Sequence, residues 1–230
     1  MKNLKLSLAL LAVMALAVAA VASGALNRPA QTGHGSMAGM NMNMTMTPSV
    51  ASSKAVQLRI TLNELLGEHA ILAIQATQRG LVGGKDFPAV AKALDDNSVA
   101  ISQAIASVYG AAAGKQFLNG KNLWRAHIKD FVAYTVATAK HDKAGQKKAV
   151  ADLMTYIQVQ AAFFAKAIGL PKQVLVNDLT AHVLQLKGAL DEYSTGNYSK
   201  TFSLVNGAYE HMYMTGAALA GGIAKEKGLK

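Results

Sequence analysis

Three stretches of this chain resemble one another and decide its fold: LLGEHAILAIQA at residues 65–76, LWRAHIKDFVAY at 123–134 and LTAHVLQLKGAL at 179–190. Each carries one histidine at an equivalent point, namely His69, His127 and His182. Each is followed by a break rich in Gly, Lys, Asp or Asn, and each break leads into a second apolar stretch. A repeat period of roughly 55 residues with this layout predicts a repeated α-hairpin.

The region after residue 54 has helical periodicity, and no alternating strand pattern competes with it. Asp86 before Phe87 and Pro88 marks a helix start, and Gly169 before Pro171 marks a helix end. We therefore predict an all-α fold, an antiparallel bundle of about six helices built from three pseudo-repeated α-hairpins. A four-helix bundle is the alternative. The expected arms are Ala55–Arg79 and Asp86–Tyr109, Lys121–Lys140 and Ala144–Ile168, and Lys172–Tyr193 and Asn197–Lys225.

The N-terminal segment has the features of an export signal: a short basic start, an apolar run from Leu6, and the small-x-small pattern Ala20-Val21-Ala22. Residues 1–25 are therefore predicted to be a signal peptide. The alternative is an N-terminal membrane anchor, because the run approaches the roughly twenty residues that span a bilayer. Either reading predicts an extracytoplasmic location, in the periplasm, in the cell envelope or as a secreted protein. Residues 26–54 are expected to form a flexible tail, and residues 55–230 one bundle domain.

The composition limits the chemistry that this chain can perform. It has no cysteine, which excludes disulfides, thiolate metal sites and iron–sulfur clusters. Its formal net charge of +10 favours anionic partners. Export and the lack of a recognition motif argue against nucleic acid as that partner. Sequence patterns of zinc proteases, nucleophile elbows and phosphate loops are also missing.

The repeated histidines are the main candidates for a functional site. Their neighbours at helical spacing are mostly apolar, so each imidazole is expected to point into the core. His211 in the last arm, with Met214 or Met212, adds an imidazole–thioether set. Nitrogen with soft sulfur favours copper over zinc as the bound metal, and zinc also lacks redox chemistry. The alternative is that duplication copied a structural core histidine three times.

A second candidate site is the tail, where His34 is followed by five methionines within ten residues of otherwise polar sequence. Thioethers on such a segment are soft, neutral ligands that select Cu(I). Compositional drift in a linker, or a sink for oxidants through methionine sulfoxide, would leave the same pattern. The predicted tail ligands are His34, Met37, Met40, Met42, Met44 and Met46.

The segments LLGEHAILA, FPAVAKALDDNSVAISQAIASVYG, LWRAHIKDFVAYT and AYEHMYMTGAALAGGI resemble a group of secreted bacterial helical proteins that are loosely labelled copper-amine-oxidase-like. The Met-rich tail resembles segments of bacterial envelope copper-handling proteins. The resemblance implies export and an all-α fold. True copper amine oxidases form a quinone from a tyrosine in a Thr/Ser-x-x-Asn-Tyr-Asp/Glu context. Because Ser199 follows Tyr198 where the acid would stand, we predict no amine oxidase activity.

These features favour an exported copper-binding protein with copper redox chemistry, such as superoxide dismutation. Superoxide is a small anion, and a cationic surface raises its encounter rate; Arg125 is the candidate steering residue. The first alternative is a copper chaperone or store without catalysis. The second is a structural cell-envelope subunit that docks an acidic protein partner through its lysines, or forms a homo-oligomer through the Gly/Ala-rich face at residues 216–222.

Overall fold

A computed structural model of the protein describes residues 53–230, and every structural statement below concerns those residues. The predicted signal peptide and nearly all of the predicted tail lie outside them. Within this part the chain forms helices and no strand, which confirms the all-α bundle. The helices are α2 (Lys54–Val82), α3 (Phe87–Tyr109), α4 (Ala111–Asn119), α5 (Trp124–Ala139), α6 (Lys143–Ile168), α7 (Lys172–Ser194) and α8 (Tyr198–Lys227).

The six long helices pair as the three predicted hairpins, α2 with α3, α5 with α6 and α7 with α8. Several of their ends follow ordinary capping rules. The Ser53 side chain accepts a hydrogen bond from the Val56 N–H at the start of α2, and Gly83 ends that helix in the left-handed conformation. Gly169 ends α6 in the same way, at φ 68°. Asp86 is the N-cap of α3 as predicted, but its side chain caps nothing and instead forms an ion pair with Arg79.

The short helix α4 was not predicted. It forms the connection in the chain between the first two hairpins. It begins after Gly110, whose φ of 89° lies in a region that residues with a Cβ rarely adopt. At Gly114 a Cβ would lie 2.7 Å from the Ser102 carbonyl oxygen, so α4 folds back closely along the end of α3. The Ser102 hydroxyl donates a hydrogen bond to the Gly114 carbonyl at 2.9 Å.

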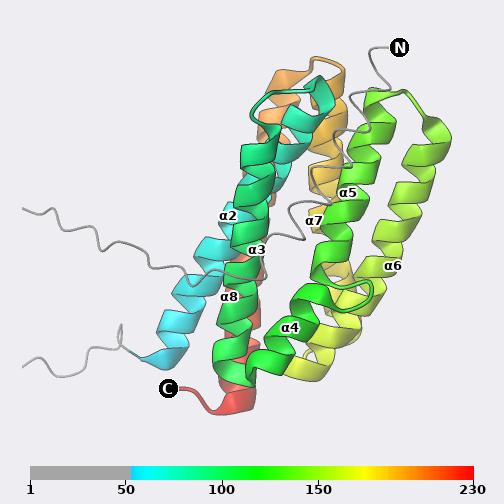
Figure 1. The fold of residues 1–230 in the computed structure, drawn as a ribbon. Coiled ribbons are helices and arrows are strands. Elements are labelled where there is room, and N and C mark those ends of the chain that lie inside the picture. Colours follow the sequence, from blue (N-terminus) through cyan, green and yellow to red (C-terminus); the bar gives the residue numbers. More distant parts are fainter. Residues whose placement is uncertain (1–52) are drawn as a thin grey trace, which may run out of the picture.

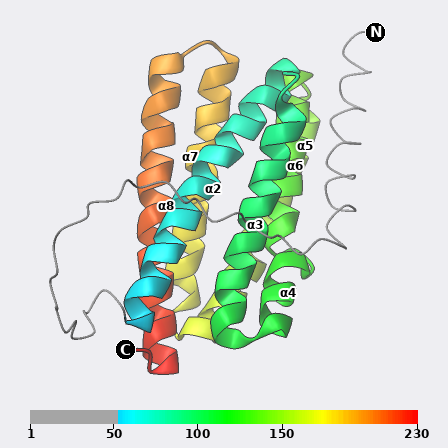
Figure 2. The same cartoon turned by 60° about the vertical axis from the view of Figure 1, so that its left-hand side comes forward.

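Helix α2 is central to the bundle. It packs most extensively against α8 and α3, and it also contacts α5 and α7. Figures 1 and 2 show it crossing the bundle between the α7–α8 pair and the helices α3, α5 and α6. At the crossing with α8, a Cβ on Gly216 would lie 2.7 Å from the Leu62 carbonyl oxygen. Gly216, in the Gly/Ala-rich face considered for oligomerisation, therefore serves packing within the chain.

One large apolar core runs through all seven helices and gives the bundle its stability. It contains apolar side chains that lie at helical spacing from the repeated histidines, including Leu66, Leu179 and Leu186. None of the described helices is both long enough and apolar enough to cross a membrane. The core also encloses polar residues, among them the three repeated histidines.

Candidate metal centre

The three repeated histidines converge in the core. They come from α2, α5 and α7, the first arms of the three hairpins, and each of these helices contacts the other two. His69 is 1 %, His127 4 % and His182 3 % exposed. The Nε2 atoms of His69 and His127 lie 3.3 Å apart. Equivalent positions of three sequence repeats thus meet at the point where the three hairpins pack together.

His69 is the middle member of the group. Its ring centroid lies 5.4 Å from that of His127 and 6.0 Å from that of His182. Within residues 53–230, however, no three His, Asp or Glu side chains are arranged so that they could hold one metal ion. The structure therefore presents a close pair of imidazoles with a third ring beside it.

Two aromatic residues enclose the pair. The Trp124 ring centroid lies 4.8 Å from both the His69 and the His127 centroids, and Tyr156 stacks on His127 at 4.5 Å. Sequence reasoning placed Trp124 among the apolar neighbours of His127 but overlooked Tyr156. The only signal was the helical register of α6, in which Tyr156 shares an apolar face with Leu153 and Ile157. The register shows which face of α6 is buried, but it does not show that His127 of α5 packs against that face.

The hydrogen bonding of the pair is incomplete. The Nδ1 atoms of His69, His127 and His182 are all buried and have no hydrogen-bond partner. A neutral imidazole carries one N–H and one lone pair. If one Nε2–H donates to the other ring, the accepting ring carries its proton on an unpartnered Nδ1. An unmet buried donor costs about 1–3 kcal/mol. If both rings carry their protons on Nδ1, two lone pairs face each other at 3.3 Å.

Burial keeps the three rings neutral. Desolvation lowers the pKa of His69 well below 6.5, and the charge of a protonated His127 would lower it further. Desolvation, reinforced by His182, lowers the pKa of His127 to about 3. Desolvation also depresses the pKa of His182, with smaller contributions from His69 and His211. Neutral imidazole is also the form that ligates metals.

Two polar neighbours act in the opposite direction, because they favour the protonated rings. These are the Asn97 side chain beside His69 and the Trp124 backbone beside His127. The contacts fall short of good hydrogen-bond geometry, since both Nδ1 atoms remain unpartnered. Asn97 donates to the Leu65 carbonyl at 2.9 Å and to the Glu68 carboxylate at 2.8 Å, while its own Oδ1 is buried and unpartnered. The Asn97 side-chain oxygen can therefore accept a hydrogen bond from a nearby N–H group.

A cavity of about 20 Å³ adjoins the pair and has His69 and His127 in its wall. The remaining lining is apolar except for Thr77. A space of this size accommodates one water-sized molecule, since roughly 10–15 Å³ is the minimum on this measure.

The fourth candidate histidine occupies a different environment. His211 Nε2 lies 3.1 Å from the Asp178 carbonyl oxygen and 3.2 Å from the Asp178 carboxylate. Thr215 donates a hydrogen bond to the same carboxylate at 3.0 Å. The hydrogen bond to Asp178 raises the pKa of His211, and desolvation opposes this only in part. His211 therefore has a partner and favours the charged form.

The two methionines predicted to accompany His211 lie in unlike places. Met212 is 1 % exposed and belongs to the apolar core, whereas Met214 is 63 % exposed. Residues two apart on a helix point in nearly opposite directions, so these two side chains cannot converge on one ion. At most one of the two methionines could therefore share an ion with His211, and that ligand set stays a prediction.

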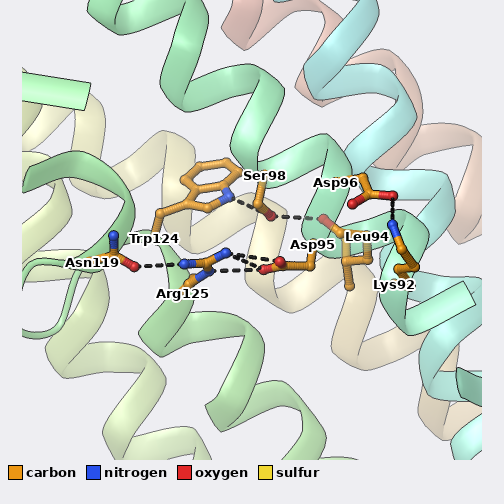
Figure 3. Close-up of polar contacts among 8 residues, drawn as sticks. All are labelled: Lys92, Leu94, Asp95, Asp96, Ser98, Asn119, Trp124 and Arg125. Carbon is orange, nitrogen blue, oxygen red and sulfur yellow. Dashed lines mark hydrogen bonds and ion pairs between the residues drawn. The ribbon is translucent and has the colours of Figure 1, made fainter. Parts of the chain in front are cut away.

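Arg125, the predicted steering residue, is held in the fold. Its guanidinium forms two hydrogen bonds with the Asp95 carboxylate, at 2.9 and 2.8 Å, and a third with Asn119 at 2.8 Å (Figure 3). The side chains are 19 % and 14 % exposed, so the charges are paired away from water. Figure 3 also shows the adjacent Trp124 donating its indole N–H to Ser98. This placement gives the anion-steering role no support, because Asp95 balances the charge of Arg125.

The tail ligands predicted from sequence, His34 and the five methionines from Met37 to Met46, lie outside the described residues. The site that the structure describes therefore rests on the histidines of the bundle. No protein-family model, curated protein or solved structure matches this chain. The resemblance to the secreted helical proteins labelled copper-amine-oxidase-like stays a prediction.

Proposed function

We propose that this protein binds copper as Cu(I) between His69 and His127 in the core of the bundle. The observation that carries the proposal is the 3.3 Å separation of two facing Nε2 atoms in neutral, buried rings. Metal–imidazole bonds are about 2.0–2.1 Å long, so two nitrogens that share one tetrahedral ion lie roughly 3.3 Å apart. An ion between the rings would accept both lone pairs and place both protons on Nδ1. There Asn97 and the Trp124 backbone are the polar neighbours.

His182 is the proposed third ligand. In a metal-bound imidazole the ring centroid lies about 3.2 Å from the ion, so rings that share an ion have centroids roughly 5–6 Å apart. The His69–His182 separation of 6.0 Å is at the upper end of that range. Because no three His, Asp or Glu side chains of residues 53–230 converge on one point, His182 would have to reorient to complete a three-nitrogen site.

The charge of the surroundings favours a monovalent ion. The ligands are neutral, and the lining of the adjoining cavity contains no carboxylate. The desolvation cost of an ion grows with the square of its charge, so a dication would cost about four times as much to bury as Cu(I). Zn²⁺ is disfavoured on the same ground, and structural zinc sites also use four protein ligands.

The closed site favours holding the ion over turning over a substrate, which makes a copper store or chaperone the first candidate function. Superoxide dismutation is the second candidate, and the cavity of about 20 Å³ beside the pair is the observation that favours it. Superoxide is a two-atom anion and so is only slightly larger than the water-sized molecule that such a space accommodates. The overall charge of +10 would attract it to the surface.

Anaerobic titration with Cu(I) against a competing chelator tests the proposal. We expect the purified protein to hold one Cu(I) that His127→Phe removes and that His141→Asn leaves in place. His141 is exposed and serves as the matched control. A variant with the five tail methionines replaced by leucine should keep this ion and lose any others. Retention of all bound copper in His127→Phe would refute the core site. Copper-dependent superoxide consumption that His127→Phe abolishes would promote the second candidate over the first.

A further inference from the structure

A pocket far larger than the histidine cavity is lined by residues of α4 and of the ends of α3, α6 and α8, together with residues of α2 and α5. Figure 1 shows α4 beside the end of α3. Its volume is about 570 Å³. Protein interiors contain few voids larger than a water molecule, and small-molecule sites span roughly 300–1,000 Å³. The size of this pocket is therefore that of a ligand site.

The walls of the pocket are almost wholly apolar. They include Leu66, Ile105, Phe117, Phe164 and Ile223, all of which belong to the buried core. Trp124 also lines it, so one indole ring separates this pocket from the histidine pair. An occupant must accordingly present apolar surface to most of the site, because water gains no hydrogen bonds from such walls.

The polar groups of the pocket are few, and positive charge predominates among them. Lys166 and Lys227 contribute two ammonium groups, and Glu226 contributes one carboxylate. Within the described part of the chain, neither lysine forms an ion pair with a carboxylate, although the Lys227 ammonium lies 4.3 Å from the centre of the Tyr109 ring. All three charged side chains belong to exposed residues, so they mark the side from which a ligand would enter.

We propose that this pocket binds a long-chain carboxylate, with the hydrocarbon chain against the apolar walls and the carboxylate at Lys166 and Lys227. A methylene group fills about the volume of a water molecule, roughly 30 Å³, so the pocket suits a chain on the order of ten to twenty carbons. The two ammonium groups supply the charge complement for the head group. The proposal is independent of copper binding, because it uses none of the histidines.

The chain offers its own reporter, since Trp124 is its single tryptophan. Stearate that carries bromine at mid-chain should quench Trp124 fluorescence saturably, with one site per protein, below the concentration at which the probe forms micelles. The corresponding brominated alcohol separates the head group from the tail. Replacing both lysines, as Lys166→Met with Lys227→Met, should weaken binding of the acid roughly fivefold to tenfold and leave the alcohol unchanged.

Filling the pocket provides the second arm of the test. Ala113 on α4 lines the pocket, whereas its neighbour Ala112 is exposed and does not. Ala113→Phe should abolish quenching by the acid, and Ala112→Phe should leave it unchanged, with circular dichroism confirming that both variants are folded. Absence of saturable quenching in the unaltered protein would overturn the proposal. So would equal binding of acid and alcohol, or undiminished quenching in a folded Ala113→Phe variant.

Discussion

The buried group of His69, His127 and His182 and the half-buried pair of His211 and Asp178 use the same side chain in opposite ways. The buried rings lack partners for Nδ1, and burial lowers the pKa of each. His211 has a carboxylate beside it, which raises its pKa. A neighbouring carboxylate thus decides whether a histidine in this bundle favours the neutral or the charged form.

The two regions are also neighbours. The charge of His211 lowers the pKa of His182. The charge of Asp178 raises the pKa of Tyr156, whose ring stacks on His127. Asp178 precedes His182 by one turn of α7, so both side chains lie on the same side of that helix. The carboxylate therefore lies at the polar edge of the histidine group.

Acidification gives the largest expected difference between the two regions. Below pH 6.5 the unfolded chain binds protons at His69, His127 and His182, whereas the folded protein does not until its lowered pKa values are reached, about 3 for His127. The metal-free protein should lose about 1.4 kcal/mol of stability per pH unit for each buried ring, and up to about 4 kcal/mol per unit for the three together. Urea denaturation at a series of pH values between 7 and 4 measures the slope. A flat profile would mean that the rings are not neutral in the folded state.

Replacing a histidine of the buried group should weaken copper binding, whereas replacing His211 should not. His182→Phe removes the proposed third ligand and should weaken Cu(I) binding about 100-fold, which corresponds to about 3 kcal/mol. His211→Gln leaves the core untouched and should change the affinity less than about threefold, or about 0.6 kcal/mol. Competition with a Cu(I) chelator gives both values. An equal loss of Cu(I) affinity in the two variants would contradict a role for His182 that His211 does not share.

Removing the buried pair should not weaken the metal-free protein. The double variant His69→Leu with His127→Phe replaces incompletely bonded polar groups with apolar ones, so we expect unchanged stability or a gain of about 1–2 kcal/mol at pH 7. Chemical denaturation of the metal-free forms provides the comparison. A loss larger than about 2 kcal/mol would identify the rings as structural members of the core.

The smallest expected effect concerns the pair of His211 and Asp178. Asp178→Asn leaves His211 without its carboxylate, so the pKa of His211 should fall and about 1 kcal/mol of stability should disappear at pH 6. The raised pKa means that this stabilisation is complete below pH 6.5 and is lost as the pH rises through the raised value. An NMR titration of the imidazole protons follows the pKa directly. An unchanged His211 titration would show that Asp178 is not its controlling partner.

The sequence was sufficient to predict the hairpins because their signals are local. Helical periodicity, Asp86 before Pro88 and Gly169 before Pro171 each act within one or two turns, and the structure confirms the positions that they predicted. Helix α4 was missed because its nine residues are too few for a periodic pattern, and its close contact with α3 depends on Gly114.

The candidate site was predictable only in part. The threefold repeat placed His69, His127 and His182 on equivalent arms, and their apolar neighbours indicated that the rings are buried. The three rings then converge if the first arms of the hairpins pack against one another. Asp95 as the partner of Arg125 and Tyr156 as the partner of His127 both lie across helix interfaces. Those contacts depend on how the hairpins pack against one another, which no local pattern in one helix specifies.

The central claim is that His69 and His127 hold one copper ion through their Nε2 atoms. X-ray absorption spectroscopy of the protein loaded with one equivalent of Cu(I) tests it most directly. We expect two or three nitrogen scatterers at about 2.0 Å from the copper, with the multiple-scattering pattern of imidazole. A spectrum with sulfur scatterers alone, unchanged in His127→Phe, would contradict it and assign the ion to the methionines instead.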